Sequence, residues 1–185
     1  MTDFAPILVT LRDARAVTLR TATADDAPAI CALRVLVASE RGFTATMPDE
    51  CPSEAVIGAR LARARPGSLC LLAYSGVDLV GELNLRPGGV RRTRHVAELG
   101  IHVRIDFRGV GLGGRMIEAA IGGAAPTVEK ITLAVFADNG PAVSLYRKLG
   151  FEVEGRRRGQ IRLEDGTWCD DLVMARWRFA RTQEG

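Results

Sequence analysis

The sequence has few of the residues that build metal sites. Its 185 residues include two histidines and four cysteines, and no two cysteines are spaced as a CxxC pair. Structural zinc sites need closely spaced cysteine or histidine ligands, so we expect no metal. We expect the cysteines to be reduced, mostly buried thiols. These residues are His95, His102, Cys31, Cys51, Cys70 and Cys169.

Long apolar runs are also missing. No stretch approaches the roughly 20 apolar residues of a membrane span, and Asp3 precedes the early stretch 6–11, where an export signal would carry basic residues. We therefore expect a soluble, cytoplasmic protein with no membrane partner. With 47% hydrophobic residues, the chain predicts one domain over residues 17–180, preceded by an N-terminal extension, residues 1–16, without a clear apolar period.

Lysine is scarce. Only Lys130 and Lys148 occur, so nearly all positive charge is arginine, and the net charge is +3. Two arginine clusters lie at residues 91–94 and 156–158. Neither is interleaved with aromatic residues, as a surface that binds single-stranded nucleic acid would be. We expect no nucleic acid partner and interpret both clusters as turn and rim charges.

The apolar pattern beyond residue 16 predicts blocks of strand and helix. Two helices, begun by Thr23 and Ser53 as capping residues, follow a first strand. Three antiparallel strands, a helix, a buried strand, a strongly amphipathic helix and two closing strands come next. The predicted class is α/β, of the α+β type. The predicted strands cover residues 17–21, 69–74, 79–85, 95–103, 131–136, 151–154 and 172–177.

Four glycines follow the third antiparallel strand and precede a helix. Glycine lets the backbone adopt positive φ and approach a ligand closely, and a helix N-terminus adds the positive end of its dipole. This layout is typical of a phosphate-binding turn, so we expect an anion such as a diphosphate there. The glycines are Gly109, Gly111, Gly113 and Gly114.

The same glycines spell the dinucleotide fingerprint GxGxxG, and Glu129 lies about 20 residues beyond them. That fingerprint normally opens the first βαβ unit of a dehydrogenase. Here three predicted antiparallel strands precede it, and too little chain follows for a doubly wound sheet. Glu129 also precedes its strand instead of ending it. The sequence therefore argues against a dehydrogenase.

Two motifs together give the chain a resemblance to the GNAT superfamily of N-acetyltransferases, over residues 17–178. Residues 108–113, Arg-Gly-Val-Gly-Leu-Gly, fit the Q/R-x-x-G-x-G/A signature for acetyl-CoA. The pattern around Glu98 is similar to members that acetylate small amines or amino acids. A second family signature, Asn then Ala then Leu-Tyr then Gly-Phe, fits Asn139, Ala142, Leu145, Tyr146, Gly150 and Phe151.

The resemblance implies a mixed, mostly antiparallel sheet that is splayed into a V and flanked by about four helices. Acetyl-CoA would lie in the cleft between the strands that end at Val103 and Phe136. Backbone groups of Ile101 and Val103 would pair with its pantetheine arm as an added strand, and N–H groups of residues 110–114 would hold its pyrophosphate. The implied cofactor-binding residues are Ile101, Val103, Arg108, Gly109, Val110, Gly111, Gly113, Gly114 and Asn139.

Acetyl transfer to an amine needs a base, an oxyanion donor and an acid for the leaving thiolate. Glu98, in the strand that leads to the cleft, is the favoured base, although an ion pair with a nearby arginine such as Arg94 or Arg104 is an equal interpretation. His102, which strand alternation places on the same face, and His95 are further candidates. The resemblance implies Tyr146 as the acid, while its position on an apolar helix stripe also fits a core side chain.

The expected reaction is direct transfer from acetyl-CoA to a primary amine of a small molecule, such as an amino acid, in a ternary complex. Two alternatives stay open: a protein N-terminus as the acceptor, as in ribosomal-type members, or a non-catalytic module that binds acetyl-CoA. We expect the acceptor site at the first helix, the loop of residues 43–51 with Asp49 and Glu50, and the closing hairpin near Trp168. At the family level, a homodimer is also expected.

Overall fold

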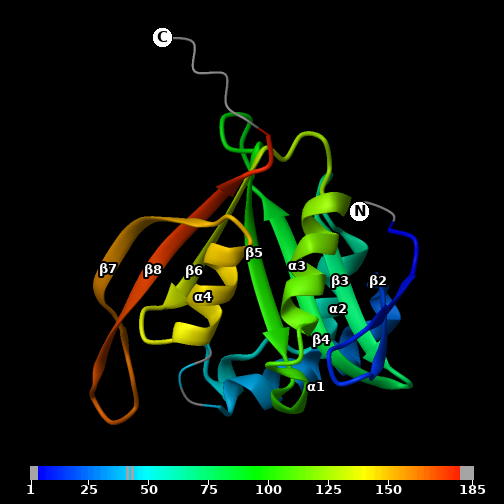
Figure 1. Cartoon of the computed structure of the whole chain (residues 1–185), viewed down its shortest axis with the longest axis horizontal. Coiled ribbons are helices and arrows are strands. Elements are labelled where there is room, and N and C mark those ends of the chain that lie inside the picture. Colours follow the sequence, from blue (N-terminus) through cyan, green and yellow to red (C-terminus); the bar gives the residue numbers. More distant parts are fainter. Residues whose placement is uncertain (1–3, 41, 43, 180–185) are drawn as a thin grey trace.

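The computed structural model describes residues 4–40, 42 and 44–179 (Figure 1). These residues form one eight-stranded sheet, in the order β1-β2-β3-β4-β5-β6-β8-β7, and four α-helices. None of these helices is long and apolar enough to cross a membrane. The strands are β1 Ile7–Thr10, β2 Ala16–Thr21, β3 Leu69–Ser75, β4 Asp78–Pro87, β5 Val96–Val103, β6 Lys130–Phe136, β7 Glu152–Arg162 and β8 Trp168–Trp177, and the helices are α1 Ala27–Ala38, α2 Glu54–Ala62, α3 Leu112–Gly123 and α4 Gly140–Lys148.

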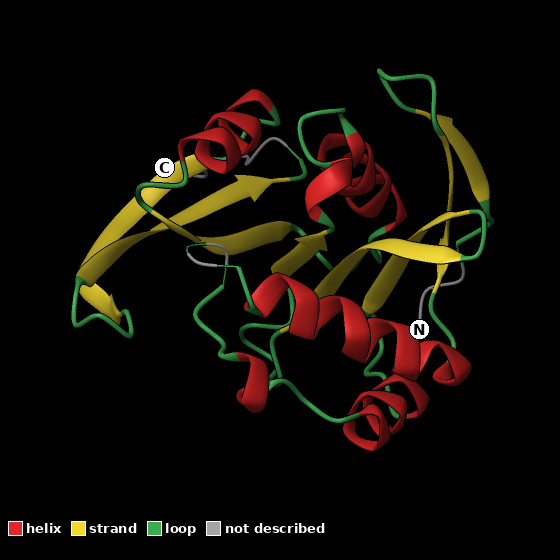
Figure 2. Ribbon diagram, turned by 90° about the horizontal axis from the view of Figure 1, so that it is seen from below, coloured by secondary structure: helices red, strands yellow, loops and turns green. Residues whose placement is uncertain are grey.

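The sheet opens between β5 and β6, which are its one parallel pair of neighbours in the described chain. Residues 96–98 of β5 pair with residues 130–132 of β6, although β5 continues to Val103 and β6 to Phe136. Beyond the paired residues the two strands diverge, so the sheet is splayed into a V (Figure 2). The expected mixed, mostly antiparallel sheet is confirmed.

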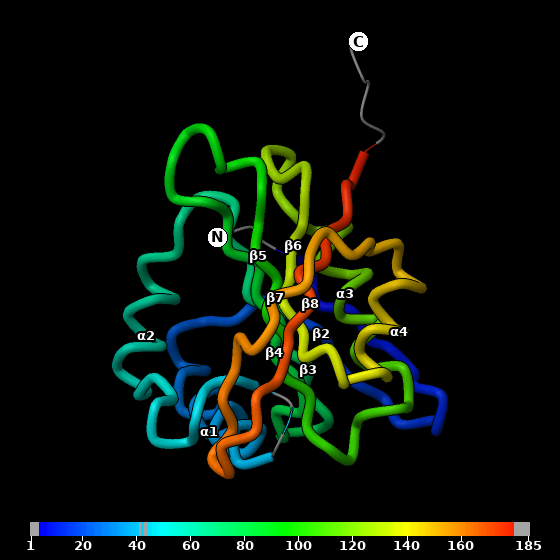
Figure 3. The backbone as a smooth tube through the Cα atoms, turned by 90° about the vertical axis from the view of Figure 1, so that its left-hand side faces the viewer, coloured from blue at the N-terminus to red at the C-terminus, as the bar shows by residue number. Residues whose placement is uncertain are grey.

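Helices cover both faces of the sheet: α3 and α4 lie on one face, α1 and α2 on the other (Figure 3). The larger buried cluster, which includes Leu83, Met116 and Ile117, packs α3 against the sheet. A smaller cluster, with Ile30 and Leu72, lies beneath α1 and α2. Because β3 and β4 are covered on both faces, most of their residues are buried. The four cysteines are free, as expected, but only Cys70 is fully buried.

The described part of the expected N-terminal extension is ordered. Ile7–Thr10 form β1, which pairs with β2 in an antiparallel arrangement. Leu11 is buried, and the Arg12 N–H donates to the Val110 carbonyl at 3.1 Å. Most side chains of β1 are exposed, so no alternation of buried and exposed residues marked this short strand in the sequence.

The closing hairpin is longer than the sequence predicts. β7 extends to Arg162, and its register against β8 shifts between Val153 and Gly155 and again between Arg157 and Ile161. A bulge adds a residue and breaks the two-residue period, which is why the predicted strand stopped at residue 154. The hairpin turns at Gly166, which has φ +84°, as its Asp-Gly pair predicts.

Candidate active site

A cleft of about 730 Å³ occupies the opening of the V. The glycine-rich loop and α4 border it on one face of the sheet, and the C-terminal part of α1 borders it on the other. The part of β5 that continues beyond its pairing with β6 lines the cleft. Its lining includes Val37, Thr44, Glu98, Gly100, Ile101, His102, Val103, Arg108, Gly109, Gly111, Gly113, Gly114, Phe136, Asn139, Leu145, Tyr146 and Asp171. The cleft therefore brings nearly all of the predicted site residues together.

The glycine-rich loop has the backbone conformation that the sequence predicts. Gly109 and Gly111 have φ +74° and +96°, and Gly111 is the N-cap of α3. Residues with a side chain adopt these values at a cost. Gly113 has a different role, because a β-carbon there would lie 3.4 Å from a methyl group of Leu145 on α4. This close approach of α3 and α4 shapes one wall of the cleft.

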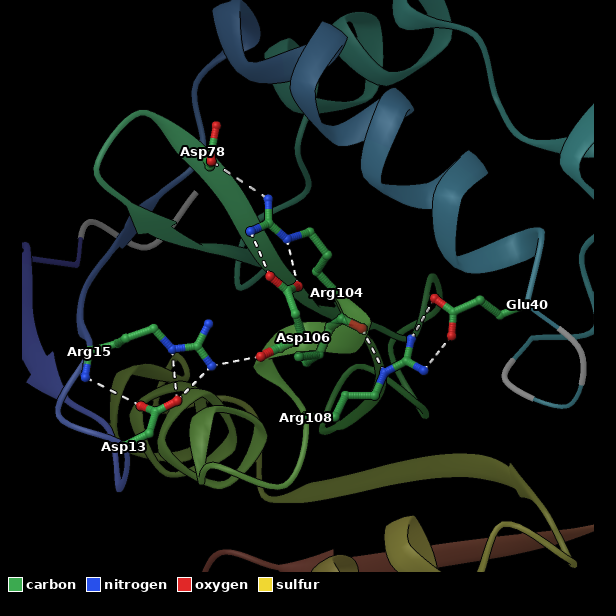
Figure 4. A network of polar contacts seen from close by, with 8 residues as sticks. Asp13, Arg15, Glu40, Asp78, Arg104, Asp106 and Arg108 are labelled. Atoms are coloured by element: carbon green, nitrogen blue, oxygen red, sulfur yellow. Dashed lines mark hydrogen bonds and ion pairs between the residues drawn. The ribbon is translucent and has the colours of Figure 1, made fainter.

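Arg108 joins the loop to both neighbouring elements (Figure 4). Its Nε donates to the Val103 carbonyl at 2.8 Å, and its Nη2 donates to Glu40, which follows α1, at 3.1 Å. Nearby, Arg15 donates to the Asp106 carbonyl at 2.6 Å. The contacts of Arg108 therefore hold the end of β5 and the start of the loop in place.

Two predicted residues of α4 face the cleft. The Asn139 side-chain oxygen accepts a hydrogen bond from the Ala142 N–H at 3.2 Å and so caps the helix. Tyr146 is 7% exposed and packs edge-on against Phe151. It is therefore a core side chain that also lines the cleft. Burial raises the pKa of Tyr146 to about 12, which keeps its hydroxyl protonated at neutral pH.

Glu98 lies at the exposed side of the cleft, with a side chain that is 64% exposed. Among the residues that the structure describes, its ion-pair partner is Arg86 on β4, at 3.8 Å. The alternative interpretation from the sequence, an ion pair with a nearby arginine, is thus found, but the partner is Arg86 of the neighbouring strand and not Arg94 or Arg104. Arg104 instead binds Asp106 through its Nε at 2.8 Å.

Strand alternation places Glu98, Gly100 and His102 on one face of β5, as predicted. Each lies opposite a β4 residue in an unbroken register, and His102 lies opposite Glu82. His95 is not part of this group, since it precedes β5 at the closed end of the V, where its carbonyl accepts hydrogen bonds from the backbone of residues 129 and 130.

Glu82 was not identified from the sequence. It is 1% exposed, and Arg34 of α1 donates to both of its carboxylate oxygens, with Nε at 2.8 Å. The Nδ1 atom of His102 lies 3.4 Å from Oε2, close enough for an ion pair but not aligned for a hydrogen bond. Burial alone would raise the pKa of Glu82, but Arg34 and His102 outweigh it and lower this pKa to about 2. The one feature of the sequence that could have indicated Glu82 is its acidic side chain between the apolar residues of a predicted strand.

Residues 35–151 match the acetyltransferase (GNAT) family model. The chain belongs to this family. It is similar to the L-amino acid N-acetyltransferase AaaT of Escherichia coli, with 33% identity over 147 residues that cover 78% of this chain and 90% of that protein. The chain is thus a GNAT N-acetyltransferase, and the resemblance seen in its motifs is confirmed.

Solved structures agree with this GNAT assignment. The GNAT acetyltransferase from Streptococcus pneumoniae superimposes with a TM-score of 0.82 and 26% identity, covering 87% of this chain and 99% of that one. The yncA protein from Salmonella typhimurium, solved with acetyl-CoA, superimposes with a TM-score of 0.80 and 19% identity, covering 91% and 98%. The splayed sheet is therefore the fold of known GNAT proteins.

The lining of this GNAT cleft includes only part of the region predicted to hold the acceptor. Val37 of α1 and Thr44 line it, as expected, together with Ile161 and Asp171 of the closing hairpin. Asp49 and Glu50 do not line the cleft, and Glu50 instead accepts a hydrogen bond from the Met47 N–H at 2.9 Å. Trp168 is 64% exposed and also lies outside the lining. Phe43, which begins the predicted loop, falls outside the described residues.

Arg12 is a further cleft residue of the acetyltransferase that the sequence did not indicate. It lines the cleft next to Gly111, where a β-carbon would lie 3.7 Å from its Nε. It was missed because it belongs to the N-terminal extension, residues 1–16, which shows no clear apolar period. Its guanidinium adds positive charge beside the glycine-rich loop.

Proposed function

We propose that this acetyltransferase moves the acetyl group of acetyl-CoA to the primary amine of an amino acid or a related small molecule. The observation that carries the proposal is one continuous cleft with the glycine-rich loop on one face of the sheet and Glu98 and His102 on the other. Similarity to an L-amino acid N-acetyltransferase supports the acceptor class.

The described residues fit acetyl-CoA. β5 has no β6 partner beyond Glu98, so the backbone of Ile101 and Val103 is placed to pair with the pantetheine amides as an added strand. The N–H groups of residues 110–114, including Gly111 at the N-cap of α3, would hold the pyrophosphate. The Arg12 side chain would balance phosphate charge. Asn139, the N-cap of α4, would lie beside the pantetheine arm.

The chemistry requires proton transfer at both ends of the reaction. The acceptor arrives as an ammonium ion and must lose a proton before its nitrogen attacks the thioester carbonyl. Glu98, the base favoured from the sequence, and His102 both face this side of the cleft. As the C–S bond breaks, the coenzyme A thiolate needs a proton, which the protonated hydroxyl of Tyr146 supplies. An α-amine suits this site, since its ordinary pKa of about 7.7–8.0 demands little help from a base.

Release of coenzyme A, followed with a thiol reagent, tests the proposal against a panel of amino acids, polyamines and short peptides. We expect turnover with amino acids and a kcat that falls by about 10²-fold or more in Tyr146→Phe, with unchanged acetyl-CoA affinity. Tyr74→Phe, a change at the other tyrosine of the chain, is the matched control and should leave kcat unchanged. Activity confined to peptides would replace the proposed acceptor with a protein N-terminus.

A second outcome would contradict the transferase proposal altogether. If calorimetry showed tight acetyl-CoA binding while no amine released coenzyme A, the protein would be a module that binds the co-substrate without using it. Glu98→Gln separates the roles of that side chain: a base predicts loss of kcat, whereas an electrostatic contact with the acceptor ammonium predicts a higher KM with unchanged kcat. Glu118→Gln, on the exposed side of α3, is its control.

A further inference from the structure

Below the acceptor side of the cleft, three charged or titratable side chains from three elements converge. Glu82 of β4 lies between Arg34 of α1 and His102 of β5. The exposed fractions of the side chains rise from 1% for Glu82 to 16% for Arg34 and 22% for His102. The set therefore runs from a buried carboxylate to an imidazole that lines the cleft.

One ring nitrogen of His102 faces the protein, while the residue as a whole lines the cleft. Nδ1 is buried and faces Glu82 Oε2 at 3.4 Å, without an aligned hydrogen-bond partner among the described residues. The side chain as a whole keeps 22% exposure, which comes from atoms other than the buried Nδ1. Catalytic hydrogen bonds are often long before substrate binds and tighten in the complex.

We propose that His102 is the general base that deprotonates the acceptor amine, and that Glu82 and Arg34 are positioning residues that hold its ring. The inference rests on the proposed acetyl transfer and deepens it. With a proton on Nδ1 pointing toward Glu82, Nε2 has a free lone pair toward the cleft. The carboxylate also stabilises the imidazolium ion that forms, in the same way that an aspartate serves the histidine of a catalytic triad.

Glu82 can serve this role because it stays ionised. Its pKa of about 2 reflects the two hydrogen bonds from Arg34 and the nearby imidazole, which outweigh the effect of burial. Cys70 of β3 lies 4.0 Å from the same carboxylate, but burial raises the pKa of its thiol far above neutral pH, so it adds no charge.

The other charged groups at the cleft do not replace His102. Glu98, on the same face of β5, is 64% exposed and lies near Arg86, and a hydrated carboxylate is a weak base toward an ammonium ion. Across the cleft, Asp171 of β8 is engaged by Arg157 of β7. An imidazole, with an ordinary pKa of about 6.5, matches a neutral operating pH better than a carboxylate does.

The proton balance of the step is complete. His102 Nε2 takes one proton from the acceptor ammonium, and the neutral nitrogen forms the N–C bond to the acetyl carbonyl carbon. The C–S bond breaks, and Tyr146 gives its proton to the departing thiolate. The nitrogen loses its second proton as the amide forms, which restores the tyrosine hydroxyl through the surrounding water. His102 releases its proton to solvent, so one net proton is produced for each transfer.

Histidine NMR tests the geometry without a disruptive variant. The chain has two histidines, so a His95→Gln variant assigns the ring signals of His102 directly. In the whole protein with acetyl-CoA bound, ¹⁵N shifts should show that neutral His102 carries its proton on Nδ1. A proton on Nε2 would overturn the proposal, because that nitrogen could then accept nothing from the amine.

Kinetics test the role. With an amino acid that the wild-type protein acetylates, His102→Gln should lower kcat/KM by about 10²-fold or more, abolish the acidic limb of its pH profile and leave acetyl-CoA affinity unchanged, while His95→Gln should match wild type. Glu82→Gln should move the acidic limb to lower pH, because loss of the anion disfavours the imidazolium; loss of stability alone would not shift it.

The outcomes separate this inference from the function on which it rests. Normal activity in His102→Gln would overturn the base assignment and leave the transferase proposal standing. A wild-type protein that releases no coenzyme A with any amine would overturn both.

Discussion

At the residue scale, Asp26 shows how local chemistry sets stability. It is 6% exposed and accepts hydrogen bonds from Arg20, the Thr23 N–H at 2.8 Å and the Tyr74 hydroxyl at 2.8 Å. Burial alone would raise its pKa, but these donors outweigh burial and hold the pKa well below its usual range. The stabilisation is therefore present above the unfolded-state pKa and is lost as the pH falls through the lower, folded-state value.

We expect Asp26→Asn to lower the free energy of unfolding by about 1–3 kcal/mol at pH 7, because buried donors would lose their charged acceptor. The difference from wild type should shrink as the pH falls below about 4, near the unfolded-state pKa of aspartate. Urea unfolding at pH 7 and at pH 3 measures this difference in the free energy of unfolding. Asp25→Asn, at the exposed neighbouring position, is the control, and an equal loss in both variants would contradict this account.

The residue scale is also where the sequence predicted least about the site. Glu98 and Tyr146 were identifiable because each lies in a local motif. Glu82 was not, since its partner Arg34 is 48 residues away and the contact exists only after α1 packs on β4. Arg12 was also missed because its contact is distant in sequence: the antiparallel pairing of β1 with β2 brings it to the glycine-rich loop.

At the element scale, two of the glycines in α3, Gly113 and Gly122, have different surroundings. Gly113 faces Leu145 of α4 closely, whereas a β-carbon at Gly122 would meet no atom within 4 Å. We expect Gly122→Ala to raise the free energy of unfolding by about 0.5–1 kcal/mol, since alanine loses less entropy in a helix. Thermal or urea unfolding measures this gain.

Gly113→Ala is the matched variant in the same helix. Its methyl group would lie 3.4 Å from a methyl group of Leu145, at the short end of ordinary contact. It should therefore gain less stability than Gly122→Ala and should weaken acetyl-CoA binding, measured by calorimetry, because it narrows the space between α3 and α4 at the cleft. Equal gains and unchanged affinity in both variants would show that the close approach of the two helices is unimportant.

Elements with a regular period were predictable, and irregular ones were not. β3, β4 and β5 followed from apolar patterns and glycine-containing turns, and α4 followed from its cap and apolar stripe. β1 is short with exposed side chains, and β7 contains two register shifts. Both features remove the alternation that a sequence pattern needs.

At the scale of the whole molecule, one topological feature creates the site. β5 and β6 are parallel neighbours that pair over only three residues and then diverge, which opens the cleft and leaves a strand edge for a ligand. Sequence patterns predict strands but not where two of them separate, so the V rested on the family resemblance. The homodimer expected from the same resemblance stays a prediction.

The central claim is transfer of an acetyl group to an amine in this cleft, and mass spectrometry of the acceptor after reaction with ¹³C-acetyl-CoA tests it most directly. The account predicts a labelled acetyl group on the α-nitrogen of an amino acid, formed at a rate that His102→Gln and Tyr146→Phe both reduce. Unlabelled amino acids after complete incubation, with acetyl-CoA either intact or merely hydrolysed, would contradict it.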